Sequence, residues 1–388
     1  MFITVAGLAT LAGCGVSARH PESAHPLPAA SLRYMHMIST TSGWAATAHR
    51  VLRTMDGGRT WLHVTPVASP HKYPHLWPVW VNRSTAFVVV DRPHSAALMR
   101  TTNGGKSWQM TGSFPVRLTR SLYGLPEFLS AQVGWFVPKS IGAAGTTLIQ
   151  LDRTTDGGGH WSPVFSDITQ NLGGGAGDVS AITFVSPEHG WMTGSASATG
   201  QVYFEETENG GGSWLHQALP VPASLSQTQW NQNLILTGAP QFFGSSHEDG
   251  VLPVDIGDLL WIYHTTDGGT RWRPVPFSAH PPPGTAQSAI DFITPGMGWV
   301  WTSQYSAAGM RQWLWQTRNG GQTWRILNTG TGSGTMEEMD FVSRNTGWAL
   351  MQKPHVHGAR WSLWKTVDGG QRWSQEVPQL ERSAVISR

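Results

Sequence analysis

The chain contains seven copies of one short pattern, and this repetition restricts its fold more than any other feature. Each copy reads T-x-[DN]-G-G-x-x-W, and successive acid or amide positions lie 47 to 58 residues apart. Self-similarity with such a period indicates that one supersecondary unit recurs along the chain. The acid or amide and the final tryptophan of the seven copies are Asp56 and Trp61, Asn103 and Trp108, Asp156 and Trp161, Asn209 and Trp214, Asp267 and Trp272, Asn319 and Trp324, and Asp368 and Trp373.

A second signal runs in phase with the first. Five repeats carry a Gly-Trp pair whose tryptophan precedes the acid or amide by 12 to 21 residues, and Ala86-Phe87 and Gly250-Val251 occupy the same slot in the other two. Seven residues before this aromatic position stands another apolar residue, usually Phe, although in the Gly250-Val251 repeat Phe243 is one residue out of place. Each repeat is therefore expected to form four short strands separated by turns.

Four strands per repeat and seven repeats predict an all-β fold, a seven-bladed β-propeller of four-stranded antiparallel blades. The alternative is a solenoid of the same units. A solenoid would need distinct polar capping repeats, and the first and last units resemble the others.

The composition agrees with many short strands joined by tight turns. Charged residues make up 13% of the 388 residues, about half the usual share, while the chain has 45 Gly and 21 Trp. Tryptophans at repeat positions are expected in the core, whereas Trp77 and Trp230 fall in long connections where a solvent-facing binding role is open. The net charge of +2 is too small to indicate nucleic-acid binding.

The turn chemistry explains the repeated residues and removes an apparent nucleotide site. Asn-Gly and Asp-Gly favour hairpin turns because these residues tolerate positive φ. Gly105-Lys106-Ser107 matches the end of a phosphate-binding loop, but such a loop needs a glycine where this chain has Arg100. The position of Lys106 varies between copies, so we expect a structural turn and no cofactor.

The repeated turn resembles the Asp-box, or BNR repeat. This resemblance covers about residues 32–380 and implies an Asp-box in each blade, linking its third and fourth strands, with the tryptophan packed between blades. Asp-box propellers include sialidases, so a glycosidase or a lectin is the alternative function. The chain lacks the Phe/Tyr-Arg-Ile-Pro motif typical of sialidases, and the sequence nominates no catalytic pair of carboxylates.

The N-terminus resembles a bacterial lipoprotein signal. Residues 2–12 form an uncharged apolar run that ends in Leu11-Ala12-Gly13-Cys14, which resembles a lipobox and implies lipidation of Cys14. The alternative is a disordered N-terminus with a chance cysteine, and the protein would be secreted if the lipobox is not used. The expected segments are a signal and lipobox (1–14), a flexible Pro/Ala/Ser tether (15–31), the propeller (32–380) and a C-terminal tail (381–388).

Lipobox, seven repeats and Gly-Trp strands together resemble the lipoprotein propellers related to photosystem II assembly and stability factors. The resemblance implies a non-enzymatic, extracytoplasmic, membrane-anchored scaffold that binds a protein, such as a membrane-protein subunit, or a carbohydrate. We expect a monomer. No metal site is expected, because the histidines of "HKYPH" (71–75) and "HVH" (355–357) lack a matching third ligand.

A partner-binding rim is expected on the face opposite the repeated turns. Loops there combine basic and aromatic residues, which suit an acidic protein segment or a carbohydrate. The candidate rim residues are Lys72, Tyr73, Trp77, Arg117, Arg120, Tyr123, Tyr305, Arg311 and Arg360.

Overall fold

The computed structural model describes residues 25–26, 32–66, 75–92, 95–115, 126–137, 139–141, 147–166, 178–196, 198–257, 259–276, 285–306, 309–330, 334–355 and 358–381. The described residues are nearly all β-structure, and their strands form antiparallel sheets in chain order. We number the sets of strands that correspond to the seven repeats as groups 1 to 7.

The first three groups cover residues 34–166. Group 1 consists of β2 (Tyr34–Met37), β3 (Gly43–Ala46), β4 (Val51–Thr54) and β5 (Thr60–His63). Group 2 consists of β6 (Leu76–Trp80), β7 (Ala86–Asp91), β8 (Ser95–Thr101) and β9 (Gln109–Pro115). Group 3 contains β10 (Glu127–Phe128), β11 (Gly134–Phe136), β12 (Lys139–Ile141), β13 (Thr147–Thr154) and β14 (Ser162–Ser166), and β11 and β12 both pair with β13.

The remaining four groups follow the same plan. Group 4 consists of β15 (Asp178–Phe184), β16 (Gly190–Ser195), β17 (Phe204–Thr207) and β18 (Leu215–His216), and group 5 of β20 (Gln241–Phe243), β21 (Asp249–Ile256), β22 (Leu259–Thr265) and β23 (Arg273–Pro276). Group 6 consists of β24 (Thr285–Thr294), β25 (Met297–Ser306), β26 (Gly309–Thr317) and β27 (Arg325–Gly330). Group 7 consists of β28 (Thr335–Phe341), β29 (Gly347–His355), β30 (Gly358–Thr366) and β31 (Ser374–Glu376).

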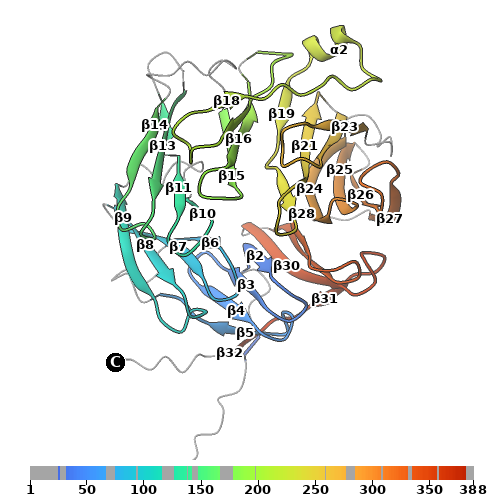
Figure 1. Cartoon of the computed structure of the whole chain (residues 1–388). Coiled ribbons are helices and arrows are strands. Elements are labelled where there is room, and N and C mark those ends of the chain that lie inside the picture. The colour runs from blue at the N-terminus through green and yellow to red at the C-terminus, as the bar shows by residue number, and fades with distance from the viewer. Residues whose placement is uncertain are drawn as a thin grey trace, which may run out of the picture.

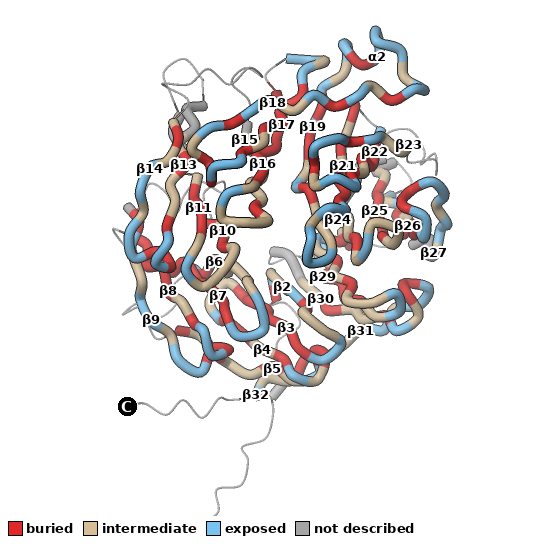
Figure 2. The backbone as a smooth tube through the Cα atoms, viewed as in Figure 1, coloured by how far each residue is buried: buried red, intermediate tan, exposed pale blue. Residues whose placement is uncertain are grey.

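The groups follow one another around a ring in chain order (Figure 1), with the first strand of each group nearest the centre and the fourth at the periphery. Buried positions are concentrated along the strands, and exposed positions mark the turns between them (Figure 2). Seven clusters of buried apolar residues lie within or between neighbouring groups. The core is therefore distributed around the ring rather than gathered at one centre.

A C-terminal strand joins the two ends of the ring. β32 (Gln379–Glu381) pairs in parallel with β5, where Leu380 lies opposite Trp61. β1 (His25–Pro26) adds an antiparallel strand on the outer side of β32. Residues 25–26 belong to the segment expected to be a flexible tether, so the part of it that the structure describes is paired with the ring.

Aromatic rings stack across most contacts between consecutive groups, which we call seams. A ring from the second strand of one group lies on a ring from the first strand of the next, with ring centroids 3.5 Å apart for Trp135 and Phe184. The motif tryptophan of the following group then packs edge-on, as Trp214 does against Phe184 at 74°. Such aromatic pairs contribute about 0.5–1.5 kcal/mol beyond burial of their area. The other stacked pairs are Trp44 with Trp80, Phe87 with Phe128, Trp191 with Phe242, and Trp299 with Phe341.

Group 5 corrects one sequence assignment. Phe242, not Phe243, pairs with Gly250 in the register that Phe184 and Gly190 show in group 4. Phe242 also stacks on Trp191. The turn between the first two strands is two residues longer in this repeat, and the spacing therefore pointed to the wrong phenylalanine.

The connection between groups 4 and 5 departs from the repeat plan. It contains α2 (Gln227–Gln232), which begins with a capping box at Ser226, and β19 (Ile235–Thr237), which pairs with both β16 and β21. Trp230 of α2 is only 5% exposed, and its indole N–H donates to the Gly200 carbonyl. The solvent-facing role left open for Trp230 is therefore wrong, because its ring packs into the core.

Candidate functional site

The repeated turns are hydrogen-bonded units between the third and fourth strands. In the second copy the Thr101 hydroxyl oxygen accepts from the Gly105 N–H at 2.9 Å, and Asn103 Oδ1 accepts from the Ser107 N–H at 3.0 Å. Gly104 and Gly105 have φ of 73° and 81°, the left-handed region that favours glycine. With the Gly105 N–H already bound and Lys106 exposed, this segment is a turn and not a phosphate cradle.

The turn geometry also explains why either Asp or Asn can stand in the motif. Either side chain offers Oδ1 to the backbone N–H four residues later, as Asp56 does to Thr60 and Asn319 does to Thr323. The second atom adapts to its neighbour: Asp56 Oδ2 accepts from the Thr60 hydroxyl, whereas Asn319 Nδ2 donates to the Thr323 hydroxyl. The two residues are therefore interchangeable in this role.

A polar link crosses the seams from the residue that precedes the motif threonine. Arg53 Nη1 donates to the Gly104 carbonyl at 3.0 Å, and Arg100 Nη1 donates to the Ala131 carbonyl at 2.9 Å. Lys365 Nζ reaches the Gly57 carbonyl at 3.3 Å and lies 4.9 Å from the Trp348 ring. The equivalent position holds Gln316 in group 6. The sequence analysis missed this role, although a basic residue at the same place in several repeats was a visible signal.

Carboxylates on the innermost strands form a second kind of link. Asp291 Oδ2 accepts from the Phe341 N–H at 2.5 Å, and Glu338 Oε2 accepts from the Met35 N–H at 2.7 Å. Asp340 accepts from the Met37 N–H, and Glu127 from the Phe184 N–H. Each carboxylate thus binds the backbone of the next group around the ring. Glu127, Asp291 and Asp340 all directly precede the apolar first-strand position, a regularity that the sequence analysis did not use.

Burial shifts the ionisation of these groups. It raises the pKa of Glu127 and of Glu338 to about 8 and that of Asp291 to about 7, although the backbone hydrogen bonds act in the opposite direction. Asp340 adds to the shifts of Glu338 and Asp291 because like charges repel. Burial lowers the pKa of His36, but its contact with Asp340, 3.4 Å from Nδ1 to Oδ2, outweighs this and leaves the pKa raised.

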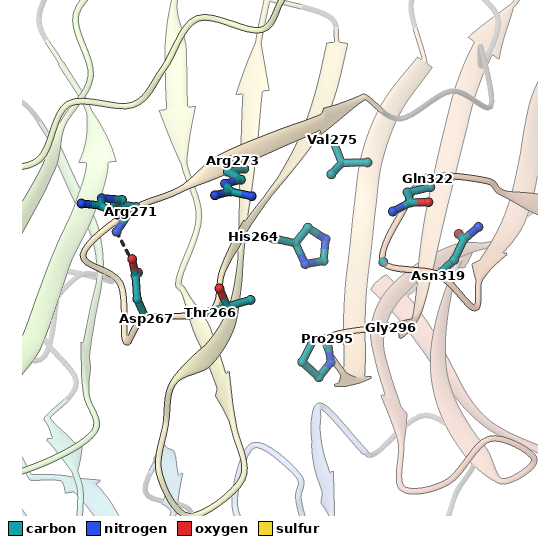
Figure 3. Close-up of a pocket in the computed structure, with 11 residues that line it drawn as sticks. His264, Thr266, Asp267, Arg271, Arg273, Val275, Pro295, Gly296, Asn319 and Gln322 are labelled. Carbon is teal, nitrogen blue, oxygen red and sulfur yellow. Dashed lines mark hydrogen bonds between the residues drawn. The ribbon is translucent and has the colours of Figure 1, made fainter.

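An open cleft of about 550 Å³ lies between groups 5 and 6. Figure 3 shows His264 pointing into this cleft from β22, with Arg271 and Arg273 on one side and Asn319 and Gln322 on the other. Burial lowers the pKa of His264, and the Gly320 backbone opposes that shift only in part. The imidazole is therefore mainly neutral at pH 7.

The candidate rim is described only in part. Lys72, Tyr73, Arg117, Arg120 and Tyr123 lie outside the described residues, as does Cys14.

The described rim residues lie on three groups. Trp77 lies in β6 and not in a long connection; it is partly buried, and its ring is 6.4 Å from that of Tyr34. Tyr305 and Arg311 lie on β25 and β26 beside their hairpin, and the Arg311 side chain is exposed. Arg360 lies on β30, opposite Lys353 of β29 in the strand register. Arg311 and Arg360 thus lie near the hairpins of second and third strands, at the opposite end of the strands from the repeated turns.

The described residues contain no group of three or more His, Cys, Asp or Glu arranged to hold a metal ion. Two histidines each contact a single carboxylate: His189 Nε2 lies 2.7 Å from Glu206 Oε1, and His216 Nδ1 lies 3.0 Å from Glu205 Oε1. Over the same ranges, no helix has the length and apolarity needed to cross a bilayer.

This architecture is that of a β-propeller, and solved structures show the same fold. No protein-family model matches the sequence, and no curated protein matches it. A structure of YCF48 bound to D1 peptide aligns with 90% of this chain and 96% of its own, at 19% identity and a TM-score of 0.54. A GH74 xyloglucanase from Xanthomonas campestris aligns over 93% of this chain at 15% identity and a TM-score of 0.57, but this chain spans only 55% of that enzyme. Sqt1 from Saccharomyces cerevisiae aligns at 9% identity and a TM-score of 0.52.

Proposed function

We propose that this protein is a non-enzymatic scaffold that binds a protein partner outside the cytoplasm. In this proposal each of the seven groups is one blade with its own Asp-box, and the lipidated Cys14 anchors the propeller to the membrane. The partner binds at the rim opposite the Asp-box turns, where Arg311 and Arg360 lie. An acidic surface on the partner would complement these cations.

The observation that carries this proposal is that carboxylates on the innermost strands are hydrogen-bonded to the backbone of the neighbouring group. A glycosidase needs two carboxyl groups that flank the scissile bond and exchange protons with it. Here Asp291, Glu338 and Asp340 instead accept backbone N–H groups from the neighbouring group. Carboxylates committed to such bonds support the ring and are poorly placed to react.

The likeness to YCF48 adds support. It extends over nearly the whole of both chains, and that protein was solved with a bound peptide. The xyloglucanase likeness is confined to about half of the enzyme. It nevertheless favours the second candidate, a glycosidase or carbohydrate-binding lectin of the Asp-box superfamily.

Crosslinking tests the scaffold. A photo-crosslinking amino acid is placed at Arg311 in the membrane-attached full chain, with a matched probe at Lys106 on the turn face as control. We expect one defined protein adduct from position 311 and none from 106. Equal labelling from the two positions would show that the partner does not bind specifically at the rim.

Enzyme assays test the alternative. The purified protein is incubated with a fluorogenic sialoside and with xyloglucan, and is applied to a glycan array. We expect neither turnover nor selective retention. Turnover above that of a heat-denatured sample would overturn the non-enzymatic reading.

Fractionation tests the anchor. Wild-type protein is expected in the detergent phase of a phase-separation experiment, and Cys14→Ala in the aqueous phase. A Cys14→Ala protein that remains in the detergent phase would show that lipid on this residue does not hold the protein.

A further inference from the structure

At the seam between groups 5 and 6, smaller side chains stand at the two positions that form long polar links at some other seams, although His264 still contacts the backbone of Gly320 in group 6. At the position before the motif threonine, where Arg53 and Arg100 reach across to the next group, group 5 has the shorter His264. In the slot where Trp135 donates its indole N–H to the Gly210 carbonyl at 2.9 Å, group 5 has Val251. The space that these larger side chains fill elsewhere is therefore open here.

The resulting cleft has a definite chemical character. The side chains of Arg271 and Arg273 border it on one side, and Asn319 and Gln322 line it from group 6 (Figure 3), with the Asn319 amide bonded to Thr323 in its own turn. The ion pairs among the described residues all join a histidine to a carboxylate. Within that part of the chain, no carboxylate oxygen therefore lies within 4 Å of the Arg271 or Arg273 guanidinium.

One carboxylate, that of Asp267, also borders the cleft. Its Oδ1 already accepts from the Arg271 N–H at 2.9 Å and from the Thr265 hydroxyl at 2.9 Å. Burial raises the pKa of Asp267, but these hydrogen bonds outweigh it and keep the group ionised. The bond from Asp267 is to the backbone N–H of Arg271 and does not engage either guanidinium group. Two arginines against one carboxylate leave the cleft cationic, and because the charge of Asp267 acts on Arg271, Arg273 is the cation assigned to the ligand.

The lining favours a peptide over a sugar. Among the described lining residues, the only aromatic ring is the imidazole of His264, and none of them offers a tryptophan or tyrosine face on which a sugar ring could stack. Arginine suits a carboxylate because its planar fork donates two parallel hydrogen bonds. The volume lies within the range of ordinary ligand sites, about 300–1,000 Å³.

We propose that this cleft binds a carboxylate side chain of an acidic peptide segment, with Arg273 as the main contact. The site is on the side of the Asp-box turns and shares no residue with the candidate rim. It can therefore fail or succeed independently of the scaffold proposal, which is tested at Arg311.

The test measures binding of a fluorescein-labelled hexaglutamate peptide to the full chain by fluorescence anisotropy, at 50 and 150 mM salt. We expect Arg273→Ala to weaken binding about tenfold or more, since it removes a charge-assisted hydrogen bond to the peptide carboxylate. Arg325→Ala is the matched control, because Arg325 follows the motif tryptophan of group 6 as Arg273 follows that of group 5 and does not line the cleft. We expect that variant to bind within twofold of wild type.

The variant His264→Arg distinguishes binding inside the cleft from general attraction of the peptide to positive charge. It adds a cation, yet it should reach the next turn as Arg53 does and fill the cleft, so we expect weaker peptide binding. Tighter binding by His264→Arg, equal losses for Arg273→Ala and Arg325→Ala, or no binding by wild type would each overturn the proposal. Oligogalacturonate and inorganic sulfate are the competing probes; Arg273-dependent binding of either in preference to hexaglutamate would also refute a peptide site. Circular dichroism and thermal melts confirm that each variant is folded.

Discussion

Glu338 provides a direct test of the carboxylate links between groups. Its Oε2 accepts from the Met35 N–H at 2.7 Å, and this bond joins the last group to the first across 303 residues. Glu338→Gln keeps an oxygen that can accept the same bond but removes the ionisable group. The variant thus separates the hydrogen bond from the cost of a buried charge.

The sign of the pH effect follows from the raised pKa. The ordinary pKa of 4.5 rises to about 8 in the folded protein, so the folded state binds the proton more tightly than the unfolded state. Stability is therefore fully present below about pH 4.5 and is lost as the pH rises towards 8. At 1.36 kcal/mol per pKa unit the loss is at most about 5 kcal/mol. Glu338 is only partly buried, so solvent screening reduces this figure.

The assay is urea unfolding followed by tryptophan fluorescence at pH 5, 7 and 9. We expect wild type to be less stable at pH 9 than at pH 5, and Glu338→Gln to recover about 2–5 kcal/mol of that loss. Glu337→Gln is the control, because Glu337 is the exposed neighbour on the same strand. If both variants follow the wild-type pH dependence, the reasoning about a desolvated carboxylate at this seam is wrong.

Substitutions at three further positions test the turns and seams, each by chemical denaturation at pH 7. Asn103→Asp should stay within about 0.5 kcal/mol of wild type, whereas Asn103→Ala should lose about 1–2 kcal/mol with the Ser107 hydrogen bond; equal effects would contradict the shared acceptor role. Gly105→Ala should cost about 2 kcal/mol or more, because φ is 81° and the added Cβ would lie 2.6 Å from Val64 Cβ. Trp135→Ala should cost about 3–5 kcal/mol, mainly through the cavity left by this fully buried side chain and partly through the lost stack on Phe184; a cost below about 1 kcal/mol would show that the seam repacks freely.

The sequence predicted the strand pattern well because it depends on neighbouring residues. Threonine, Asp or Asn, and two glycines within five positions are enough to form the turn, and the structure places each such turn between third and fourth strands. Buried Trp61 and Trp348 likewise follow from their repeat positions. Trp77 and Phe243 were misplaced, because the lengths of connections and turns vary and change the spacing on which such assignments rest. Trp230 does lie in a connection, but its burial depends on how that connection packs against the ring.

What the sequence by itself determined is the repeating unit: its turns, its four strands and the aromatic residues that fill its core. Only the tertiary structure decided how the units meet. The bonds from Glu127 to Phe184 and from Glu338 to Met35 join residues far apart in the chain, so no local pattern reveals them. The cleft beside His264 arises in the same way. Val251 and His264 are ordinary residues in their own strands, and they leave a space only because the next group around the ring carries nothing that fills it.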